Sequence, residues 1–350
     1  MSSRELTSNA MIAKVQGLFA KRLNSRNYKE LVGKRSIPEI ASYLKKETYF
    51  SAVLEGINEQ AIHRGQLEFL IRQNTYDKMK RLLRYVDSDK NEYYQLVVFY
   101  YEISLILFKI RTLGREETIN LEMNYMNIDK KHASFSYASL YAVKDIEALS
   151  ELLKPTRYFP ILELIKTRTE SDINFTEIEQ ELNQIIFRYI MNKIDEDYSG
   201  KEQLKIKEML KTRLELINVG RLYRLKKYFQ LTEDEIRNLL MVEPVNIPAE
   251  MWEKWICEID SNKADSIYEM LKSTKYHRFM KDEPFNYIEY HIQGILYRIA
   301  QKEIRAGEIS EVVYYQFMNF LNVEVENIIC VIEGVRYNYE PSKIEARIVQ

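Results

Sequence analysis

A pattern of apolar and polar positions typical of a helix occurs twice in the chain, at residues 175–194 and 285–304, with an offset of 110 residues and no gap. The apolar positions recur every three or four residues, which is the spacing of one face of an α-helix. A long helix that returns at this distance predicts a repeated domain. The matched positions are Phe175/Phe285, Ile178/Ile288, Glu179/Glu289, Ile185/Ile295, Arg188/Arg298 and Ile194/Ile304.

A short helix followed by a turn recurs three times along the chain. Each turn begins with Leu-Lys and has a tyrosine five positions after the leucine, at Tyr49, Tyr158 and Tyr276. Apolar residues at helical spacing precede each turn, and Ser36 and Asp145 stand at capping positions before the first two helices. We therefore expect a short helix before each of the three tyrosines.

A glutamate within an apolar helix follows each of these turns. The three helices share a phrase that begins with Glu102, Glu215 and Glu324 and continues with aliphatic residues. A turn and a further short helix come next, and the Thr-Glu-Asp-Glu sequence at residues 232–235 has the pattern of a capping box. The order of elements is thus the same in three copies.

Three helical repeats are the domain organisation that this order predicts. We expect them to cover residues 1–118, 119–241 and 242–350. Alternation with a period of two is rare, and the chain has only 10 glycines and 7 prolines, so few residues interrupt helices. The sequence predicts an all-α protein in which each repeat forms a small helical bundle.

Composition narrows the class of protein. Lys and Arg total 51 and Asp and Glu total 52, so the net charge of -1 argues against a globally basic nucleic-acid binder. Two cysteines cannot build a disulfide scaffold. We find no continuous run of 18 apolar residues and no apolar core typical of a signal peptide near residue 1. We expect a cytoplasmic protein that contacts a membrane only through partners.

Sequence signatures of common chemistry are missing from the chain. The Gly-Lys pairs at residues 33–34 and 200–201 lack the remaining residues of a phosphate-binding loop. The four histidines are widely spread, and neither a zinc-protease motif nor a Cys-x-x-Cys pair occurs. We therefore predict no catalytic residues, no cofactor and no metal site.

Five charged residues stand at apolar positions of the predicted helices: Glu102, Glu215, Glu324, Arg188 and Arg298. A buried charge needs a partner. The hypothesis is that Glu215 pairs with Arg188, and Glu324 with Arg298, inside the bundles. Two alternatives remain open, namely that these residues line a contact surface or that a carboxylate is catalytic.

Aromatic and basic clusters have structural interpretations first. Trp252 and Trp255 lie three residues apart among apolar neighbours, which favours core packing over an exposed binding hot spot. The basic runs at residues 80–84 and 221–227 are typical of solvated helix faces or helix ends, with phosphate contact as the alternative.

The three-fold order of these motifs resembles the C subunit of the A/V-type rotary ATPases, a relative of the d subunit of the eukaryotic vacuolar ATPase. The resemblance covers essentially the whole chain and includes the ending Asn-Ile-Ile-Cys-Val-Ile-Glu-Gly-Val-Arg-Tyr at residues 327–337. Two positions depart from the pattern. Leu105 stands where the other copies have asparagine, and Glu47 stands where the other turns have threonine.

The resemblance implies a non-catalytic subunit of an ion-translocating ATPase. Three similar bundles would surround a pseudo-threefold axis and form a funnel. The funnel would receive the central-shaft subunits on one side and rest on the membrane proteolipid ring on the other. The subunit would turn with the rotor and transmit torque for H⁺ or Na⁺ transport or ATP synthesis. No nucleic acid is expected as a partner.

Two functions from other classes remain as alternatives. One is a generic all-α interaction scaffold unconnected with an ATPase. The other is an all-α enzyme with a carboxylate site in a central cavity, for which Glu102, Glu215 and Glu324 are the candidates because they recur.

Overall fold

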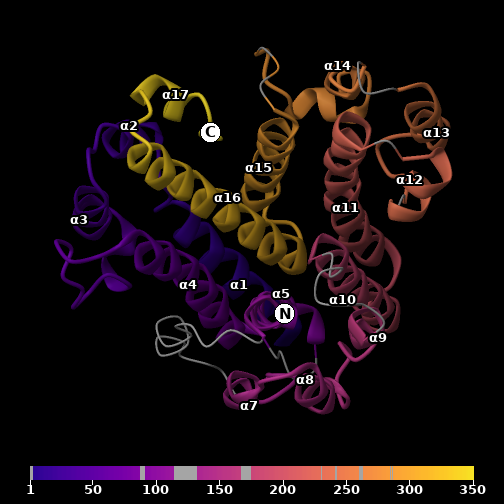
Figure 1. Cartoon of the computed structure of the whole chain (residues 1–350), viewed down its shortest axis with the longest axis horizontal. Coiled ribbons are helices and arrows are strands. Elements are labelled where there is room, and N and C mark those ends of the chain that lie inside the picture. Colours follow the sequence, from indigo (N-terminus) through magenta and orange to yellow (C-terminus); the bar gives the residue numbers. More distant parts are fainter. Residues whose placement is uncertain are drawn as a thin grey trace. The chain divides into compact units, whose positions relative to one another are not determined.

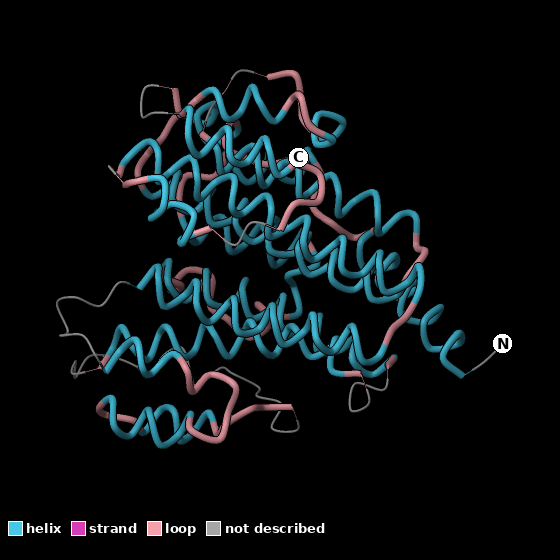
Figure 2. Tube along the Cα trace, turned by 90° about the vertical axis from the view of Figure 1, so that its right-hand side faces the viewer, coloured by secondary structure: helices cyan, strands magenta, loops and turns pink. Residues whose placement is uncertain are grey.

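A computed structural model describes residues 3–86, 91–113, 132–166, 175–229, 231–240, 243–259, 263–283, 285 and 287–350. All regular structure in these ranges is helical, which confirms the predicted all-α class (Figures 1 and 2). The predicted repeat boundaries at 118/119 and 241/242 lie outside the described residues. The division into three repeats therefore stays a prediction.

The α-helices are α1 (Ser3–Phe19), α2 (Ser25–Val32), α3 (Ile37–Glu47), α4 (Arg64–Leu82), α5 (Leu96–Thr112), α7 (Tyr137–Ala142), α8 (Ile146–Leu153), α9 (Ile161–Lys166), α10 (Phe175–Asp197), α11 (Gly200–Tyr228), α12 (Glu233–Leu239), α13 (Ala249–Glu258), α14 (Ser266–Leu271), α15 (Ile288–Ala306), α16 (Ser310–Arg336) and α17 (Pro341–Glu345). Short 3₁₀-helices include η1 (Tyr49–Ala52), η3 (Glu92–Gln95) and η5 (Lys275–Phe279).

The chain folds into two compact units that are not simple consecutive halves. The first unit combines Met1–Leu67 with Ser199–Gln350, and the second is the continuous segment Glu68–Tyr198. The first unit is therefore built from two stretches that are far apart in the sequence. Each unit has its own helical core.

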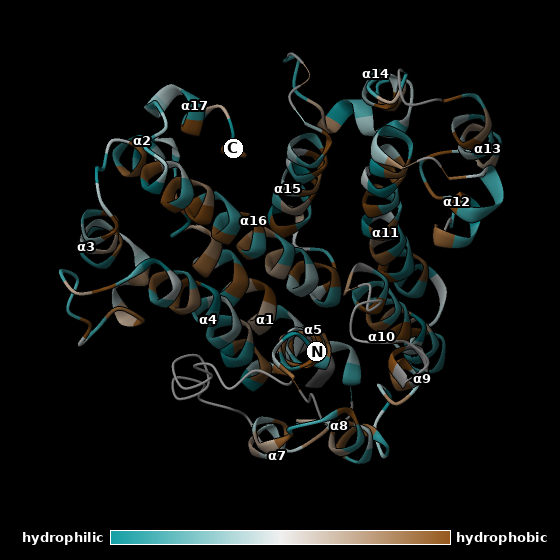
Figure 3. Cartoon of the chain, viewed as in Figure 1, coloured by the Kyte–Doolittle hydropathy of each residue, from teal (hydrophilic) through white to brown (hydrophobic). Residues whose placement is uncertain are grey.

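The core of the first unit is built on four long helices, α1, α11, α15 and α16. Helix α16 packs against α15 and α1, and α11 packs against α15 (Figure 1). Gly220 allows α11 to approach α15 closely, because a Cβ at this position would lie 2.9 Å from Cδ1 of Ile292. The ribbon coloured by hydropathy shows hydrophobic residues distributed along these helices (Figure 3). The two tryptophans of α13, Trp252 and Trp255, are buried, which confirms their predicted place in the core.

The second unit is organised around α5, which packs against α10. The stretch Glu92–Thr112, which includes α5, is long and apolar enough to cross a membrane, yet 72% of its apolar 18-residue segment is buried within the protein. A helix in the core of a protein can be equally long and apolar. Helix α5 also places Glu102 and Lys109 in the interior, so we assign it to the core of this unit.

Threonine side chains define the recurring turns. Oγ1 of Thr156 accepts a hydrogen bond from the Tyr158 amide at 3.2 Å, and Oγ1 of Thr274 accepts one from the Tyr276 amide at 3.1 Å. In the first turn Thr48 has this role one position later, with the Phe50 amide at 3.2 Å. The first turn therefore also has its threonine, displaced by one residue from the expected position.

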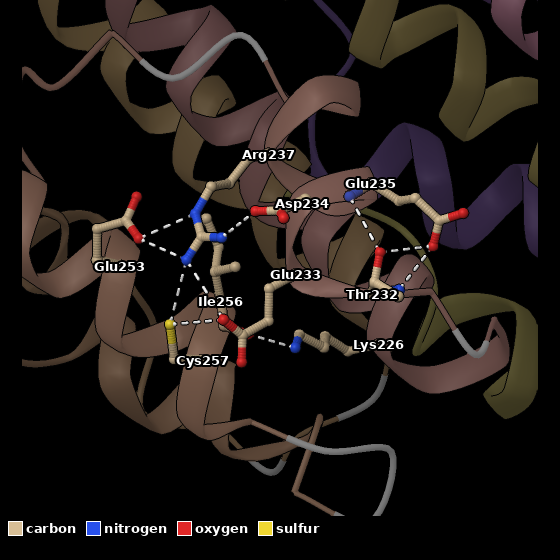
Figure 4. A network of polar contacts seen from close by, with 9 residues as sticks. All are labelled: Lys226, Thr232, Glu233, Asp234, Glu235, Arg237, Glu253, Ile256 and Cys257. Carbon is tan, nitrogen blue, oxygen red and sulfur yellow. Dashed lines mark hydrogen bonds and ion pairs between the residues drawn. The ribbon is translucent and has the colours of Figure 1, made fainter.

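The predicted capping box at residues 232–235 and the predicted cap at Ser36 both form, with different hydrogen bonds. Thr232 and Glu235 form the complete reciprocal box at the start of α12. Arg237 of the same helix reaches Oε2 of Glu253 in α13 at 3.1 Å and ties the two helices together (Figure 4). At the start of α3, Ser36 accepts from the Glu39 amide, whereas the Glu39 carboxylate accepts from the Arg35 amide. That helix is capped, but without the reciprocal bond of a full box.

Candidate functional site

Glu215 of α11 is the first of three buried carboxylates that hold distant segments together. Its side chain is 2% exposed, and its two oxygens accept hydrogen bonds from the amides of Val245, Asn246 and Ile247 at 3.0 to 3.3 Å. The hydroxyl of Tyr276 donates to Oε2 at 2.5 Å. The carboxylate thus fixes the loop before α13 and the η5 turn on one helix.

Glu102 of α5 has the same kind of environment in the second unit. It is fully buried and accepts a hydrogen bond from the Ser134 amide at 2.6 Å and another from the Ser134 hydroxyl at 2.7 Å. The hydroxyl of Tyr158 donates to Oε2 at 2.7 Å, and that of Tyr137 donates to Oε1 at 3.3 Å. Here too, one carboxylate binds a backbone amide and the tyrosine of a recurring turn.

Glu324 of α16 completes the set. It is 1% exposed and accepts a hydrogen bond from the Leu23 amide at 2.7 Å. The hydroxyl of Tyr49 donates to its Oε2 at 2.7 Å. Helix α16 is thereby joined to the loop before α2 and to the turn after α3, both of which belong to the same unit.

The three contacts follow one rule. Each glutamate binds the tyrosine that belongs to the next predicted repeat: Glu102 binds Tyr158, Glu215 binds Tyr276, and Glu324 returns to Tyr49. A charge-assisted hydrogen bond of this kind contributes about 1.5–3 kcal/mol. The recurring glutamate and the recurring turn tyrosine are therefore the acceptor and the donor of the same hydrogen bond.

Burial and hydrogen bonding act in opposite directions on these groups. Burial raises the pKa of the Glu102 carboxyl, and the hydrogen bonds from Ser134 and Tyr158 oppose that rise. Burial, followed by the nearby glutamate, raises the pKa values of Tyr49, Tyr158 and Tyr276 well above the ordinary value for a phenol. The tyrosines are therefore protonated donors throughout the physiological range.

The two arginines that the sequence singled out have other described partners. Arg188 donates to Oε1 of Gln184 at 2.7 Å and lies 3.7 Å from Oε1 of Glu181. Arg298 donates through Nε to the carbonyl of Phe279. Burial lowers the pKa of Arg298, and nearby Glu283 opposes this change. The proposed pairing of the arginines with Glu215 and Glu324 stays a prediction.

A groove lies between α11, α15 and α16 in the first unit. It encloses about 360 Å³, with an apolar floor and a charged rim. Nδ2 of Asn319 donates to Gln316 at 3.3 Å, whereas Oδ1 of this 5% exposed residue has no hydrogen-bond partner in the described part of the chain. A buried acceptor in this position favours contact with a donor group. The lining includes Arg213, Ile217, Gly220, Arg224, Glu289, Ile292, Gln293, Leu296, Asn319, Asn322, Val323 and Glu326.

Within the described ranges, metal-ligating and thiol side chains do not gather into a further site. No group of three or more His, Cys, Asp or Glu side chains suited to a metal ion occurs among the residues that the structure describes. Cys257 and Cys330 are both free thiols, with Cys257 exposed and Cys330 half-buried. Neither thiol takes part in the three glutamate sites.

The chain matches known proteins over most of its length. Residues 11–347 match the family model described as ATP synthase (C/AC39) subunit. The C subunit of the A-type ATP synthase of Methanosarcina acetivorans is 24% identical over 261 residues, which cover 71% of this chain and 68% of that protein. The resemblance predicted from the three-fold order of motifs is thereby confirmed. The chain belongs to the ATP synthase (C/AC39) subunit family, as a protein similar to the C subunit of the A/V-type ATPases.

Proposed function

We propose that this protein is a non-catalytic rotor subunit that couples the central shaft of an A/V-type ATPase to the membrane proteolipid ring. It would transmit torque during ATP-driven transport of H⁺ or Na⁺, or during ATP synthesis. The family match supports a place in such a complex, because it extends over residues 11–347. The further assignment rests on how the helices are held together.

The observation that carries the proposal is the set of three buried glutamate–tyrosine contacts. A part that transmits torque must resist shear between its helices. Each contact joins a long helix to a turn far away in the sequence, with separations of 56, 61 and 275 residues. Because the carboxylates are buried and bind several donors, they serve as internal braces, and this supports a structural role over a catalytic one.

We assign the contact with the shaft to the groove between α11, α15 and α16. Its floor offers apolar area, and its rim carries Arg213 and Arg224 together with Glu289 and Glu326. We propose an amphipathic helical end of the shaft as the occupant, with its apolar face against Ile217, Ile292 and Leu296 and charged side chains of both signs at the rim.

The resemblance adds the arrangement expected in the assembled enzyme. We propose three related bundles about a pseudo-threefold axis, forming a funnel between shaft and ring. The protein would be peripheral on the cytoplasmic face, with its membrane contact supplied by the ring. The identity of the transported ion would be set in the ring.

Affinity purification from detergent-solubilised membranes tests the assignment. We expect the tagged full-length chain to recover shaft subunits and proteolipid together. A chain with Ile217→Glu and Leu296→Glu in the groove should lose the shaft while its helical circular dichroism is retained. The matched control is Leu204→Glu, because Leu204 lies on α11 but is 66% exposed and outside the groove.

The possible results separate the candidate functions. Recovery of neither shaft nor proteolipid by the unaltered chain would refute the proposal and favour a scaffold of another assembly. Equal loss of the shaft in the groove variant and in the control would refute the groove as its contact surface. Recovery of both partners, with selective loss of the shaft in the groove variant, supports the full assignment.

A further inference from the structure

A second, smaller cavity in the first unit has the chemistry of an anion site. It encloses about 70 Å³ between α11, η5, α15 and α16. Four cationic side chains and two carboxylates line it, so its lining carries an excess of two positive charges on a protein whose net charge is -1. The charged residues are Lys205, Lys275, Arg278 and Lys302 with Glu208 and Glu303.

Secondary structure brings two of these cations to one side. Lys275 and Arg278 are three residues apart in the 3₁₀-helix η5, and side chains at that spacing eclipse each other because the helix has three residues per turn. Both are exposed, and neither makes an ion pair within the described residues. Two neighbouring positive groups therefore face the cavity without neutralisation.

The other two cations share one acidic partner. Nζ of Lys205 lies 3.4 Å from Oε1 of Glu303, and Nζ of Lys302 lies 3.9 Å from the same oxygen. A single carboxylate thus stands between two ammonium groups. Glu208 is the other acidic residue in the lining, and Glu215 lies behind Tyr276 with its oxygens occupied by backbone amides.

Polar side chains form one part of the lining, which we call its floor, beside the apolar side chains of Met209, Phe279, Ile299 and Val312. Gln316 of α16 is 4% exposed, and in its one described hydrogen bond Oε1 accepts from Asn319. Its amide nitrogen is the group left to donate toward a ligand. Thr212, Asn246 and Tyr276 complete the floor and are linked by hydrogen bonds of 3.2 Å from the Asn246 amide to each hydroxyl. This floor is preorganised by the Glu215 contacts.

We propose that this cavity binds a phosphate group, carried by inorganic phosphate, by a nucleotide or by a lipid headgroup. One water requires about 10–15 Å³ of cavity volume, so the cavity holds roughly five waters, and phosphate has a similar number of heavy atoms. Lysine and arginine are the side chains that recognise phosphate oxygens. The site lies outside the groove assigned to the shaft and requires no other protein chain.

Titration of the full-length chain with phosphate tests the site. Isothermal calorimetry should show saturable binding of inorganic phosphate when the ionic strength is matched with chloride. We expect Lys275→Gln with Arg278→Gln to weaken this binding about tenfold or more, since each substitution removes a cation that donates charge-assisted hydrogen bonds to phosphate oxygens. The matched control is Arg336→Gln with Lys343→Gln, which removes two exposed cations that do not line the cavity, one on α16 and one on α17.

A chemical footprint gives a second measurement. Phosphate should slow acetylation of Lys275 and Lys302, read by mass spectrometry, while Lys343 continues to react at its original rate. Parallel titrations with ATP and with vesicles containing phosphatidic acid identify the carrier of the phosphate group. A weaker response of the cavity variant to at least one of these probes supports the proposal. Equal binding by the unaltered chain, the cavity variant and the control, or no saturable binding of any probe, overturns it.

Discussion

The hydroxyl of Tyr49 donates a hydrogen bond of 2.7 Å to the carboxylate of Glu324, 275 residues further along the chain. The same carboxylate also accepts a hydrogen bond from the Leu23 amide at 2.7 Å. Helix α16 is thus held to two segments from the beginning of the sequence. Because the carboxylate is 1% exposed, water cannot replace a donor that is lost without structural change.

Loss of the Tyr49 hydroxyl should therefore destabilise the first unit. We expect Tyr49→Phe to lower the free energy of unfolding by about 1–3 kcal/mol, because the buried carboxyl group of Glu324 loses a hydrogen-bond donor. Urea denaturation followed by circular dichroism measures the change. Tyr339→Phe is the control, since this tyrosine is 43% exposed. An equal effect of the two substitutions would contradict the brace.

Glu215→Ala should be more damaging than loss of one hydroxyl. It would leave the amides of Val245, Asn246 and Ile247 and the hydroxyl of Tyr276 without their common acceptor. We expect a loss of at least about 3 kcal/mol, since each unsatisfied buried group costs about 1–3 kcal/mol. Glu215→Gln, which retains an acceptor oxygen, should lose less. Stability of the alanine variant equal to that of the unaltered chain would argue against this role.

Stability should depend on pH through Glu102. Burial raises the pKa of this carboxyl above its ordinary value of 4.5, so the folded state binds its proton more tightly than the unfolded state does. The resulting contribution is fully present below pH 4.5 and is lost as the pH rises through the higher folded value.

The measurement is the difference in unfolding free energy between the unaltered chain and Glu102→Gln. As the pH is raised from about 4 to about 7, we expect the unaltered chain to lose stability relative to Glu102→Gln. The reason is that Glu102 becomes charged in the buried site, whereas a glutamine there stays neutral. Glu340→Gln serves as the exposed control. A difference that is flat across the range would show that the Glu102 pKa is the same in the folded and unfolded states.

Packing of α17 on α16 depends on Gly334. A Cβ at this position would lie 2.5 Å from Cγ1 and 2.6 Å from Cδ1 of Ile344. We expect overpacking in Gly334→Ala to lower the free energy of unfolding by about 1–3 kcal/mol. The higher helix propensity of alanine offsets about 1 kcal/mol of this loss. Ile344→Ala in the same chain should relieve the clash. Limited proteolysis near residue 340 provides the measurement, and unchanged cleavage in the single variant would contradict it.

Much of the architecture was predictable because its causes are local. Helical spacing of apolar residues and the scarcity of glycine and proline are read directly from the sequence, and the all-α class follows. The repeated helices are present as α10 and α15, the latter beginning at Ile288 rather than at the predicted Phe285. The reason is the backbone of Tyr287, which is extended at φ -142° and ψ 151° and so cannot belong to the helix.

The pairing of the buried glutamates was not predictable in the same way. The sequence identified Glu102, Glu215 and Glu324, and it also identified the three turn tyrosines. The sequence did not connect the two sets, because helical periodicity is a property of a single helix, whereas each contact joins one predicted repeat to the next. A tyrosine hydroxyl and a backbone amide can satisfy a carboxylate as well as an arginine can, and spacing along the chain does not distinguish them.

The groove and the anion cavity were equally hidden from the sequence. Gln316 and Lys302 lie on different helices, and Lys275 lies on a short 3₁₀-helix. Such residues come together only through tertiary packing. The turn at residues 272–278 is rich in basic residues, which is the one sequence feature that could have indicated the cavity. Basic residues are also common at the ends of helices, so this feature does not distinguish an anion site from an ordinary helix end.

The first unit combines the beginning and the end of the sequence, so it can be completed only after the second unit has been synthesised. Its final brace requires Glu324, which is synthesised 301 residues after Leu23. At roughly 5–20 residues per second, that interval is about 15–60 s. The continuous segment Glu68–Tyr198 has been synthesised long before then. It can therefore fold while the first helices still lack their packing partner α16. The apolar faces of those early helices are therefore exposed on the nascent chain for that interval, which makes them candidates for protection by chaperones.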